Sequence, residues 1–530
     1  MMLRNLARKT SVSPNLAANP LGYVNKKEFE SVRGRYTINL DFTVFSKWMN
    51  RRKMALPFNK TKIVCTIGPA SKSSKIIEQM IMAGMNIARI NFSHGDFEEH
   101  ADIISTIREV SERLGRDVAI LADLPGPKIR IGILREEPIE LRIGDVICLT
   151  TDDIIGDKRR VSVNLPNLTQ AVKKGDQIFL NDGLIQLEVL AVVDRDVKCE
   201  VKVGAELRSR KGLNLPGISL GIGAFTDRDY ECLRFALEQQ VDAVSQSFVE
   251  SASDIDSLRK SASVLGASPF VIAKIERSKA LQNIDQILAA ADGVMIARGD
   301  LGVETPIESI ALLQKEIMAK ANLMAKPVIT ATQMLESMTG NRRPTRAECT
   351  DVANAILDGT DCVMLSAESA TGDYPVDAVL TLAKIATLTE NYRSRRPIGH
   401  FLPMPEIQEN INIRDLIAVS VKNAVEHIQP DAVFVPTRSG ASARSMSRFK
   451  LPVWIVAVSS LQTTCRRLHF SYGVYPQLEF EHPDNWRDFT TSWLAQNDMI
   501  GKLVILTEGP SSKHPETNNR MELVDLSRVF

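Results

Sequence analysis

Two short apolar stretches of the sequence end in charged residues that could do chemistry. The first, Val271–Glu276, places Lys274 and Glu276 on one face, because side chains two residues apart along a strand point the same way. The second begins at Gly293 and leads into a glycine-rich turn that contains Asp300. Two carboxylates suit Mg²⁺, which keeps some of its water, and an ammonium beside them suits a phosphoryl group in transfer. On its own, however, a Lys-x-Glu pair is more often a structural ion pair.

The elements that would position these residues are short apolar strands that alternate with helical segments from residue 62 to about 390. We expect eight strands, at Lys62–Ile67, Asn86–Ile90, Val118–Asp123, Val241–Ser245, Phe270–Ile275, Gly293–Ile296, Pro327–Thr330 and Cys362–Leu365. This pattern predicts a parallel (β/α)₈ barrel, whose active site lies at the C-terminal ends of the strands. Nearly every predicted strand is followed there by polar residues, namely Ser71, Arg89, Asn91, Ser93, His94, Asp123, Gln246, Arg298, Thr332, Gln333, Ser366 and Glu368.

Two further regions extend the predicted barrel. Residues 131–210 interrupt it after the third strand with alternating, turn-punctuated segments, which predict a small β-barrel. Such an insert could be a lid that excludes water from the active site, or mere decoration. After a basic, proline-rich linker, an α/β pattern begins with a helix at Asn412–His427 and a strand at Ala432–Val435. We therefore expect an α/β fold with a (β/α)₈ barrel from residues 60–130 and 211–393, a β-barrel lid domain at 131–210 and a C-terminal α/β domain at 406–530.

Composition excludes several classes of protein. The 530 residues carry 65 Lys and Arg against 64 Asp and Glu, a net charge of +1 that offers no support for binding nucleic acid or a membrane surface. No apolar run reaches the roughly 18 residues of a membrane helix. The seven cysteines are scattered without CxxC pairs, which is typical of reduced thiols in a cytoplasmic protein.

The amino terminus allows two interpretations. Residues 1–27 contain five basic residues and no acidic one, a composition that fits an organelle transit peptide. Pro14 and Pro20 interrupt any amphipathic helix, and Met54 would make an internal start just before the first strand. We therefore expect residues 1–59 to be a disordered extension and the protein to be cytoplasmic, with an organelle as the alternative if residues 1–53 are a transit peptide.

Eight blocks of the sequence resemble one family, the pyruvate kinases. They stand in the family's order and cover residues 60 to 390, at Lys62–Ser71, Ala88–Gly95, Gly126–Arg130, Lys211–Gly217, Ala273–Glu276, Ala297–Glu304, Ala331–Ser337 and Met364–Glu368. The resemblance implies transfer of a phosphoryl group from phosphoenolpyruvate to ADP, which gives pyruvate and ATP in the last step of glycolysis. It also implies a homotetramer.

The resemblance assigns a role to each of the residues that bind the substrate. Glu276 and Asp300 would hold Mg²⁺ or Mn²⁺, and Lys274 would neutralise charge on the phosphoryl oxygens. Arg89 would clamp the phosphate, because a guanidinium matches phosphate oxygens in pairs. Backbone N–H groups of the turn before a helix near Pro306, together with the Thr332 hydroxyl, would take the substrate carboxylate. The turn comprises Ala297, Arg298, Gly299 and Asp300.

The proton that completes pyruvate has three candidate donors. Thr332, Ser366 and Glu368 could each act through water, and the sequence does not rank them. For Thr332 and Ser366, an ordinary helix cap is an equally good interpretation.

Nucleotide contacts would come from residues at the edge and tip of the insert. Arg130, Lys211 and Asp182 would meet ADP, with Arg130 near the phosphates. Asn-Asp-Gly around Asp182 is also simply a good turn. His94 is a further candidate for binding the nucleotide, and we expect a structural rather than catalytic role for it.

One departure from the family pattern concerns monovalent cations. In the family Asn91, Ser93, Asp123 and the carbonyl of the residue at position 124, here Leu124, bind K⁺, and a glutamate accompanies them. This chain has Lys128 at the glutamate position and Leu124-Pro125 where many relatives have Thr-Lys. Because the Lys128 ammonium would repel K⁺ and could stand in for it, K⁺ is a doubtful cofactor and we expect activity without added K⁺.

The C-terminal domain offers a second site. A loop that follows a strand and opens a helix resembles the family's site for effectors such as phosphorylated sugars, with Thr437, Arg438, Ser439, Gly440 and Ser442 as candidates. A plain strand-to-helix turn is an equally good interpretation, and a nucleotide is an alternative effector.

Two other functions remain open from the sequence. One is a catalytically weak relative kept for binding or scaffolding, which the Leu124-Pro125 change permits. The other is a Mg²⁺-dependent barrel lyase, for which the Lys-x-Glu pair and Asp300 would serve equally well.

Overall fold

The computed structural model describes residues 56–218, 221, 223–398, 412–509 and 518–527. The alternative transit peptide, residues 1–53, and all but residues 56–59 of the expected extension, residues 1–59, lie outside the described residues. Within the described chain, no helix is both long and apolar enough to span a bilayer.

Eight parallel strands close into a barrel in the order β1-β16-β15-β14-β13-β12-β3-β2. This confirms the predicted (β/α)₈ fold, and each strand lies within two residues of its predicted bounds at both ends. The strands are β1 (Lys62–Thr66), β2 (Ile87–Asn91), β3 (Ala119–Asp123), β12 (Ala243–Gln246), β13 (Phe270–Ile275), β14 (Gly293–Ala297), β15 (Val328–Ala331) and β16 (Cys362–Leu365).

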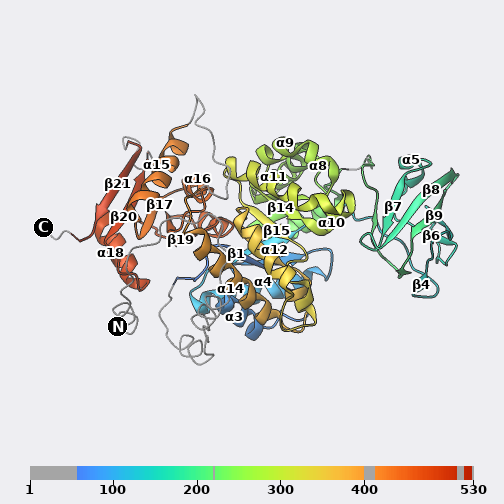
Figure 1. Ribbon diagram of the computed structural model, residues 1–530, viewed down its shortest axis with the longest axis horizontal. Helices are drawn as coiled ribbons and strands as arrows, with labels where there is room; N and C mark the ends of the chain where they lie inside the picture. The colour runs from blue at the N-terminus through green and yellow to red at the C-terminus, as the bar shows by residue number, and fades with distance from the viewer. Residues whose placement is uncertain (1–55, 219–220, 222, 399–411, 510–517, 528–530) are drawn as a thin grey trace, which may run out of the picture. The chain divides into compact units, whose positions relative to one another are not determined.

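The barrel helices lie outside the strands, as α11, α12 and α14 show in Figure 1. Several begin where the sequence supplies a cap: Thr226 and Thr345 form capping boxes before α6 and α12, and Asp96 caps α4. The barrel helices are α3 (Ser74–Ala83), α4 (Phe97–Leu114), α6 (Asp227–Glu238), α7 (Ala252–Val264), α8 (Ser278–Gln282), α9 (Ile284–Ala290), α10 (Arg298–Glu304), α11 (Ile310–Leu323), α12 (Arg346–Leu357), α13 (Ala367–Ala370) and α14 (Pro375–Arg393).

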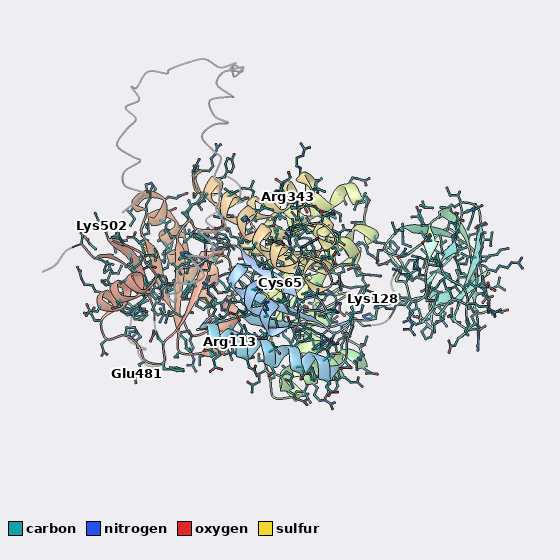
Figure 2. The ribbon with its side chains drawn as sticks, turned by 90° about the horizontal axis from the view of Figure 1, so that it is seen from below. Cys65, Arg113, Lys128, Arg343, Glu481 and Lys502 are labelled. Atoms are coloured by element: carbon teal, nitrogen blue, oxygen red, sulfur yellow. The ribbon has the colours of Figure 1, made fainter. Side chains whose placement is uncertain are left out.

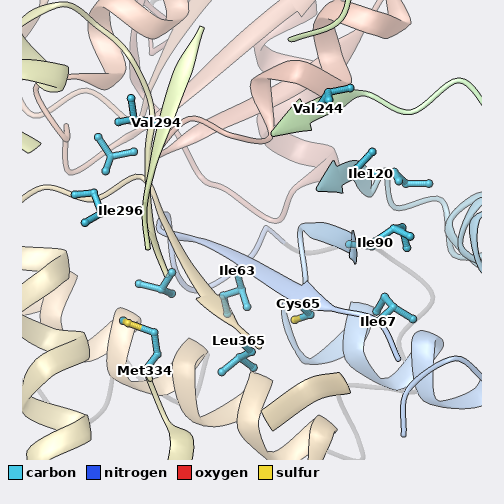
Figure 3. Packing of buried hydrophobic residues seen from close by; sticks show 14 of the residues in the cluster. Ile63, Cys65, Ile67, Ile90, Ile120, Val244, Val294, Ile296, Met334 and Leu365 are labelled. Atoms are coloured by element: carbon cyan, nitrogen blue, oxygen red, sulfur yellow. The ribbon is translucent and has the colours of Figure 1, made fainter. Parts of the chain in front are cut away.

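Two apolar layers hold the barrel together because successive strand residues point to opposite faces. Ile63 and Cys65 of β1 point outward and join the cluster between strands and helices, part of which Figure 3 shows. Val64, between them, points inward and belongs to the cluster inside the barrel.

A residue of the C-terminal domain completes the inner layer. Phe470 is fully buried within the inner cluster and stacks on Phe270, with ring centroids 5.6 Å apart. The Cys362 thiol donates to the Phe470 carbonyl over 3.4 Å, and Lys62 Nζ donates to the Val474 carbonyl over 2.7 Å. The N-terminal end of the barrel is therefore closed by the C-terminal domain.

The insert after β3 consists of strands, as expected, apart from one short helix, α5. Its strands form a six-stranded sheet in the order β11-β7-β8-β9-β5-β6 and a two-stranded ladder of β10 and β4, around a core of its own. The elements are β4 (Ile139–Glu140), β5 (Val146–Thr150), β6 (Arg160–Ser162), α5 (Leu168–Ala171), β7 (Gln177–Leu180), β8 (Ile185–Val193), β9 (Asp196–Val203), β10 (Glu206–Leu207) and β11 (Leu213–Asn214).

The C-terminal domain is a five-stranded sheet in the order β19-β18-β17-β20-β21, in which β21 alone runs antiparallel to its neighbour. Asn412 caps its first helix, at the start that the sequence predicted. The elements are α15 (Ile413–Ile428), β17 (Ala432–Pro436), α16 (Ala441–Ser447), β18 (Trp454–Ser459), α17 (Gln462–Leu468), β19 (Val474–Leu478), α18 (Trp486–Gln496), β20 (Leu503–Glu508) and β21 (Arg520–Asp525).

One local expectation was wrong. The sequence predicted a turn at Ala297–Asp300 that leads to a helix near Pro306, whereas the helix α10 already begins at Arg298, directly after β14. The helix near Pro306 is present as a 3-10 turn, η1 (Ile307–Ser309), that leads into α11. Gly299 and Gly302 disfavour a helix by propensity, but the buried residues Leu301 and Glu304 anchor it, so tertiary packing overrides propensity here.

Candidate active site

Lys274 lies at the C-terminal end of β13, surrounded by acceptors. Its Nζ is 2.9 Å from Glu276 Oε1 and 3.4 Å from Asp123 Oδ1, and it donates to Ser247 Oγ over 2.7 Å. Burial alone would lower the pKa of Lys274, but the charges of Asp123 and Glu276 outweigh it and raise the pKa to about 12. Lys274 is therefore a permanent cation at the strand ends.

Asp123, at the end of β3, joins Lys274 to Arg89 of β2. Arg89 donates to Asp123 Oδ2 from both Nε, over 2.9 Å, and a terminal nitrogen, over 2.5 Å, and it donates to Thr66 Oγ1 over 2.8 Å. Burial would raise the pKa of Asp123, but Lys274 and Arg89 hold it below its ordinary value. The residues predicted at the ends of three different strands thus form one network.

Two serines of this network were missed from the sequence. Ser245 Oγ donates to Asp123 Oδ1 over 2.7 Å. Ser247 Oγ accepts from Lys274 and donates to the Leu124 carbonyl over 2.7 Å. Both flank Gln246 at the end of β12, so their place after a barrel strand was the available signal.

The two predicted metal ligands differ in their surroundings. Glu276 is buried, and its Oε2 accepts from the Phe248 N–H over 2.7 Å. Asp300 is half-buried in α10, and this burial, with the neighbouring charge of Glu276, raises its pKa to about 6. Within the described residues no group of three or more His, Cys, Asp or Glu side chains could hold a metal ion. The donor set therefore suits a hard cation that takes few ligands from the protein and the rest from water and substrate.

Thr332 is placed beside the start of α10 by an unusual backbone. Its φ is 68° and that of Gln333 is 54°, both in the left-handed region that is strained for a β-branched residue such as threonine. Thr332 Oγ1 accepts from the Gly299 N–H over 2.8 Å and donates to the Ala331 carbonyl over 2.6 Å. The strand end and the helix start are therefore joined through this hydroxyl.

The Arg298 guanidinium donates to this strained segment and is itself fixed by other side chains. It pairs with Asp351 at 2.7 Å and donates to the Thr332 carbonyl over 3.0 Å. It also contacts Gln314 and Met334. The side chain of Arg298 is thus engaged by the protein.

Comparison with known proteins identifies the family. A family model described as pyruvate kinase, barrel domain, matches residues 58–379, and one described as pyruvate kinase, alpha/beta domain, matches residues 415–524. The chain belongs to the pyruvate kinase family. The enzyme transfers the phosphoryl group of phosphoenolpyruvate to ADP, which gives pyruvate and ATP, and members of the family need a divalent metal ion.

Relatives from distant organisms match most of this pyruvate kinase. It is 49% identical over 470 residues to a pyruvate kinase of Thermococcus litoralis, a match that covers 88% of this chain and 98% of that protein. It is 42% identical over 479 residues to one of Geobacillus stearothermophilus, covering 89% of this chain and 81% of the other. Among solved structures, a pyruvate kinase from Cryptosporidium parvum superposes with a TM-score of 0.82 at 33% identity, over 88% of this chain and 96% of that one.

Two of the three candidate proton donors of the pyruvate kinase site, Ser366 and Glu368, lie just after β16, and the third, Thr332, follows β15. Glu368 is fully buried, and its two carboxylate oxygens accept from the Leu335 N–H over 3.0 Å and the Ser366 N–H over 2.7 Å. Ser366 is half-buried. Glu368 thus orders the backbone at Leu335 and Ser366.

Of the four residues proposed for K⁺, Asn91, Asp123 and Leu124 have oxygens that already meet a donor. Asn91 Oδ1 accepts from the Ser93 N–H over 3.2 Å, Asp123 accepts from Arg89 and Ser245, and the Leu124 carbonyl accepts from Ser247. Lys128 is exposed where the chain leaves the barrel for the insert (Figure 2).

The positive charge of Lys128 lowers the pKa of two other groups in the site. Burial lowers the pKa of the His94 imidazole, and Lys128, Arg130 and Arg89 lower it further. Lys128 also opposes the rise in the pKa of Asp300. His94 is therefore a neutral ring on the basic side of the site.

The remaining nucleotide candidates lie where the chain passes from the barrel into the insert and back, and at the tip of a hairpin in the insert. Arg130 pairs with Gly212 in an isolated bridge and donates to the Arg210 carbonyl over 3.0 Å, beside the half-buried Lys211. Asp182 is exposed with a φ of 55°, in the turn between β7 and β8.

The candidate effector loop connects β17 to α16. The Gly440 N–H donates to Thr437 Oγ1 over 3.0 Å, the Ala441 N–H donates to Ser439 Oγ over 3.4 Å, and the Arg438 carbonyl accepts from Thr464 over 2.7 Å. Ser442 lies half-buried in the first turn of α16. These bonds are what a well-formed strand-to-helix turn also requires.

Proposed function

We propose that Lys274 neutralises the charge that builds on the phosphoryl oxygens during transfer. In this step the bond from phosphorus to the enolate oxygen of phosphoenolpyruvate breaks as a bond to a terminal ADP oxygen forms. The observation that carries the proposal is the position of the Lys274 ammonium, buried at the strand ends between Asp123 and Glu276 with a raised pKa. A fixed cation in such a site needs no reorganisation as charge develops.

Arg89 has donors left for the substrate phosphate. A guanidinium carries five N–H groups. Three of its bonds go to Asp123 and Thr66, so the remaining edge can bind phosphate oxygens in a fixed orientation.

Glu276 and Asp300 would hold the divalent ion, which we propose to be Mg²⁺ or Mn²⁺. The ion would act as a Lewis acid on the oxygens of the substrate. Glu276 Oε1 lies 2.9 Å from Lys274 Nζ, and the charges of Glu276 and Lys274 both act on Asp300, so the cation and the proposed metal ligands belong to one cluster.

The substrate carboxylate would bind at the start of α10. Backbone N–H groups from Ala297 to Asp300 and the Thr332 hydroxyl are the donors we propose. The Gly299 N–H and Thr332 Oγ1 bond to each other over 2.8 Å, so the carboxylate would replace that bond. We propose that the final proton reaches the enolate carbon through water held by Thr332 or Ser366, with Glu368 as the residue that positions both.

The finer assignments extend this proposal. Lys128 supplies the positive charge that K⁺ would otherwise supply. The nucleotide contacts Arg130, Lys211, Asp182 and His94. The loop from Thr437 to Ser442 takes a phosphorylated effector, and the enzyme is a cytoplasmic homotetramer.

The substitution Lys274→Met tests the central role. In an assay that couples pyruvate to lactate dehydrogenase, with phosphoenolpyruvate, ADP and Mg²⁺, we expect this variant to lose most of its turnover. Lys320→Met is the matched control, because Lys320 pairs only with the exposed Asp285 on the barrel surface. Retained turnover in Lys274→Met would refute the role of the ammonium.

A further inference from the structure

Arg277 directly follows the proposed metal ligand Glu276 and makes a different set of contacts. It is buried, with 4% of the residue exposed. Nη1 lies 3.1 Å from Glu304 Oε1, and Nη2 donates to the Ile218 carbonyl over 2.9 Å. Nε lies 3.5 Å from Glu250 Oε1. One cation therefore joins the end of β13 to three other segments of the chain.

Glu304, the partner of Arg277, is the last residue of α10. It stands four residues after Asp300, and side chains four residues apart lie on the same face of a helix. The charge of Glu276 acts on Asp300, and the Arg277 guanidinium contacts Glu304. Two consecutive residues after β13 thus meet two residues on one face of α10.

The two pairs have opposite electrostatic signs. Burial and then the charge of Glu276 raise the pKa of Asp300, and Lys274 opposes the rise. With no divalent ion between them, the two carboxylates therefore repel, which pushes α10 away from the strand end. Arg277 and Glu304 carry opposite charges 3.1 Å apart and pull the same two elements together. Both effects are stronger inside a protein than in water, because the effective dielectric constant is lower there.

Glu304 depends on Arg277 for compensation of its charge. It is 6% exposed, and burial raises the pKa of its carboxyl. The charge of Arg277 is the largest effect that opposes this rise, followed by the N–H groups of Ser278 and Gly217. A buried carboxylate is costly unless a cation pairs with it. The end of α10 is therefore tied to the residue that follows Glu276.

The loop after β12 fixes the strand-end residues from another side. The Phe248 N–H donates to Glu276 Oε2 over 2.7 Å, and Glu250 Oε1 lies 3.5 Å from Arg277 Nε. Glu250 also pairs with Lys279 at 2.8 Å. Because the strand end is fixed by this loop, the position of α10 sets the spacing of the two proposed metal ligands.

We propose that the ion pair of Arg277 and Glu304 holds Glu276 and Asp300 at the spacing that a divalent cation needs, before the cation binds. The inference rests on the proposed function, in which these two carboxylates are the metal ligands. Arg277 and Glu304 are positioning residues, because they act on the metal through the place of α10. A site that is formed in advance binds its ion more tightly, since binding does not have to move the helix.

Electron paramagnetic resonance of Mn²⁺ measures the metal affinity of the full chain without substrate, because the free ion gives the sharp spectrum. Glu304→Gln keeps the shape of the side chain and removes its charge, and we expect the Kd for Mn²⁺ to rise at least about fivefold. Glu390→Gln is the matched control, because Glu390 is a buried carboxylate that accepts from the Lys60 and Thr61 N–H groups before β1. A smaller rise in Glu304→Gln, or an equal rise in Glu390→Gln, would overturn the inference.

The sign of a second change separates positioning from the long-range effect of charge. Arg277→Met removes a cation near the site, so charge alone would tighten Mn²⁺ binding, whereas a displaced α10 would weaken it. We expect weaker binding, and tighter or unchanged binding would contradict the proposal.

A double variant covers the case in which Arg277→Met does not fold, since that change leaves Glu304 buried without its cation. Arg277→Met with Glu304→Gln has the net charge of the parent and removes both members of the pair. Its Mn²⁺ affinity should also fall. Affinity equal to that of the parent, in a double variant whose Tm shows that it is folded, would refute the role of the pair.

Variants of the ligands separate this inference from the proposed function. Glu276→Gln and Asp300→Asn each remove one proposed ligand charge and should weaken Mn²⁺ binding more than Glu304→Gln does. If both bind Mn²⁺ like the parent, the assignment of the metal ligands fails, and the inference fails with it. If both bind it weakly while Glu304→Gln binds it like the parent, the role of the ion pair alone fails.

Discussion

The substitution Ser247→Ala tests whether the network at the strand ends sets the catalytic power of Lys274. Ser247 Oγ accepts from Lys274 Nζ over 2.7 Å and donates to the Leu124 carbonyl over 2.7 Å, and the residue is 2% exposed. Alanine removes both bonds and introduces no new group. Lys274 then keeps only the two carboxylates, Glu276 at 2.9 Å and Asp123 at 3.4 Å, and is free to move toward them.

The expected size follows from the charged bond. Hydrogen bonds to charged groups contribute about 1.5–3 kcal/mol. If this amount is lost from transition-state stabilisation, kcat falls by about 10- to 150-fold, because each 1.4 kcal/mol is about a factor of ten. The KM for phosphoenolpyruvate should change little, because Arg89 and the start of α10 remain in place.

Steady-state kinetics in the coupled assay measure the effect. Ser247→Thr keeps the hydroxyl and should recover most of the activity, whereas Ser257→Ala, whose hydroxyl bonds only within α7, should behave like the parent enzyme. A kcat for Ser247→Ala within about twofold of the parent, with unchanged Tm, would show that the carboxylates alone position Lys274.

Three further predictions concern other parts of the molecule. In a tetramethylammonium buffer, the parent enzyme should be active without K⁺, whereas the turnover of Lys128→Glu should depend on added K⁺. Strong stimulation of the parent by K⁺ would show that the Lys128 ammonium does not replace the ion. Arg298→Lys should lower kcat by about tenfold with little change in KM, because lysine cannot bond Asp351 and the Thr332 carbonyl in one plane; an unchanged kcat would show that the strained segment holds itself. His469 is buried with a pKa lowered to about 3 and no partner for either ring nitrogen, so protons bind the unfolded chain first as pH falls below about 6.5. The free energy of unfolding should therefore drop by about 2 kcal/mol between pH 7 and pH 5, and urea unfolding of His469→Gln should show a shallower drop.

The barrel and the main site residues could be predicted because both are local in sequence. Each strand is a short apolar run, and residues at or near its C-terminal end lie at one face of the barrel, where the structure has Arg89, Asp123, Lys274 and Glu276. The serines that bond to these residues could not be predicted. Ser245 and Asp123 are 122 residues apart in the sequence, and serine carries no charge that would mark it as part of the site.

The strained backbone could not be predicted from the sequence either. The left-handed φ of Thr332 and the helix α10 with its two glycines both contradict residue propensity, and both depend on contacts that only the folded chain supplies.

The burial of Phe470 inside the barrel bears on how the chain unfolds. A phenylalanine removed from such a core costs about 3–5 kcal/mol, and the barrel would also lose the bonds to Cys362 and Lys62. A protein cut between barrel and C-terminal domain would therefore expose the inner cluster at one end. Calorimetry should find one cooperative transition for these two parts, so the boundary between their sequence patterns is not a boundary between independent folding units.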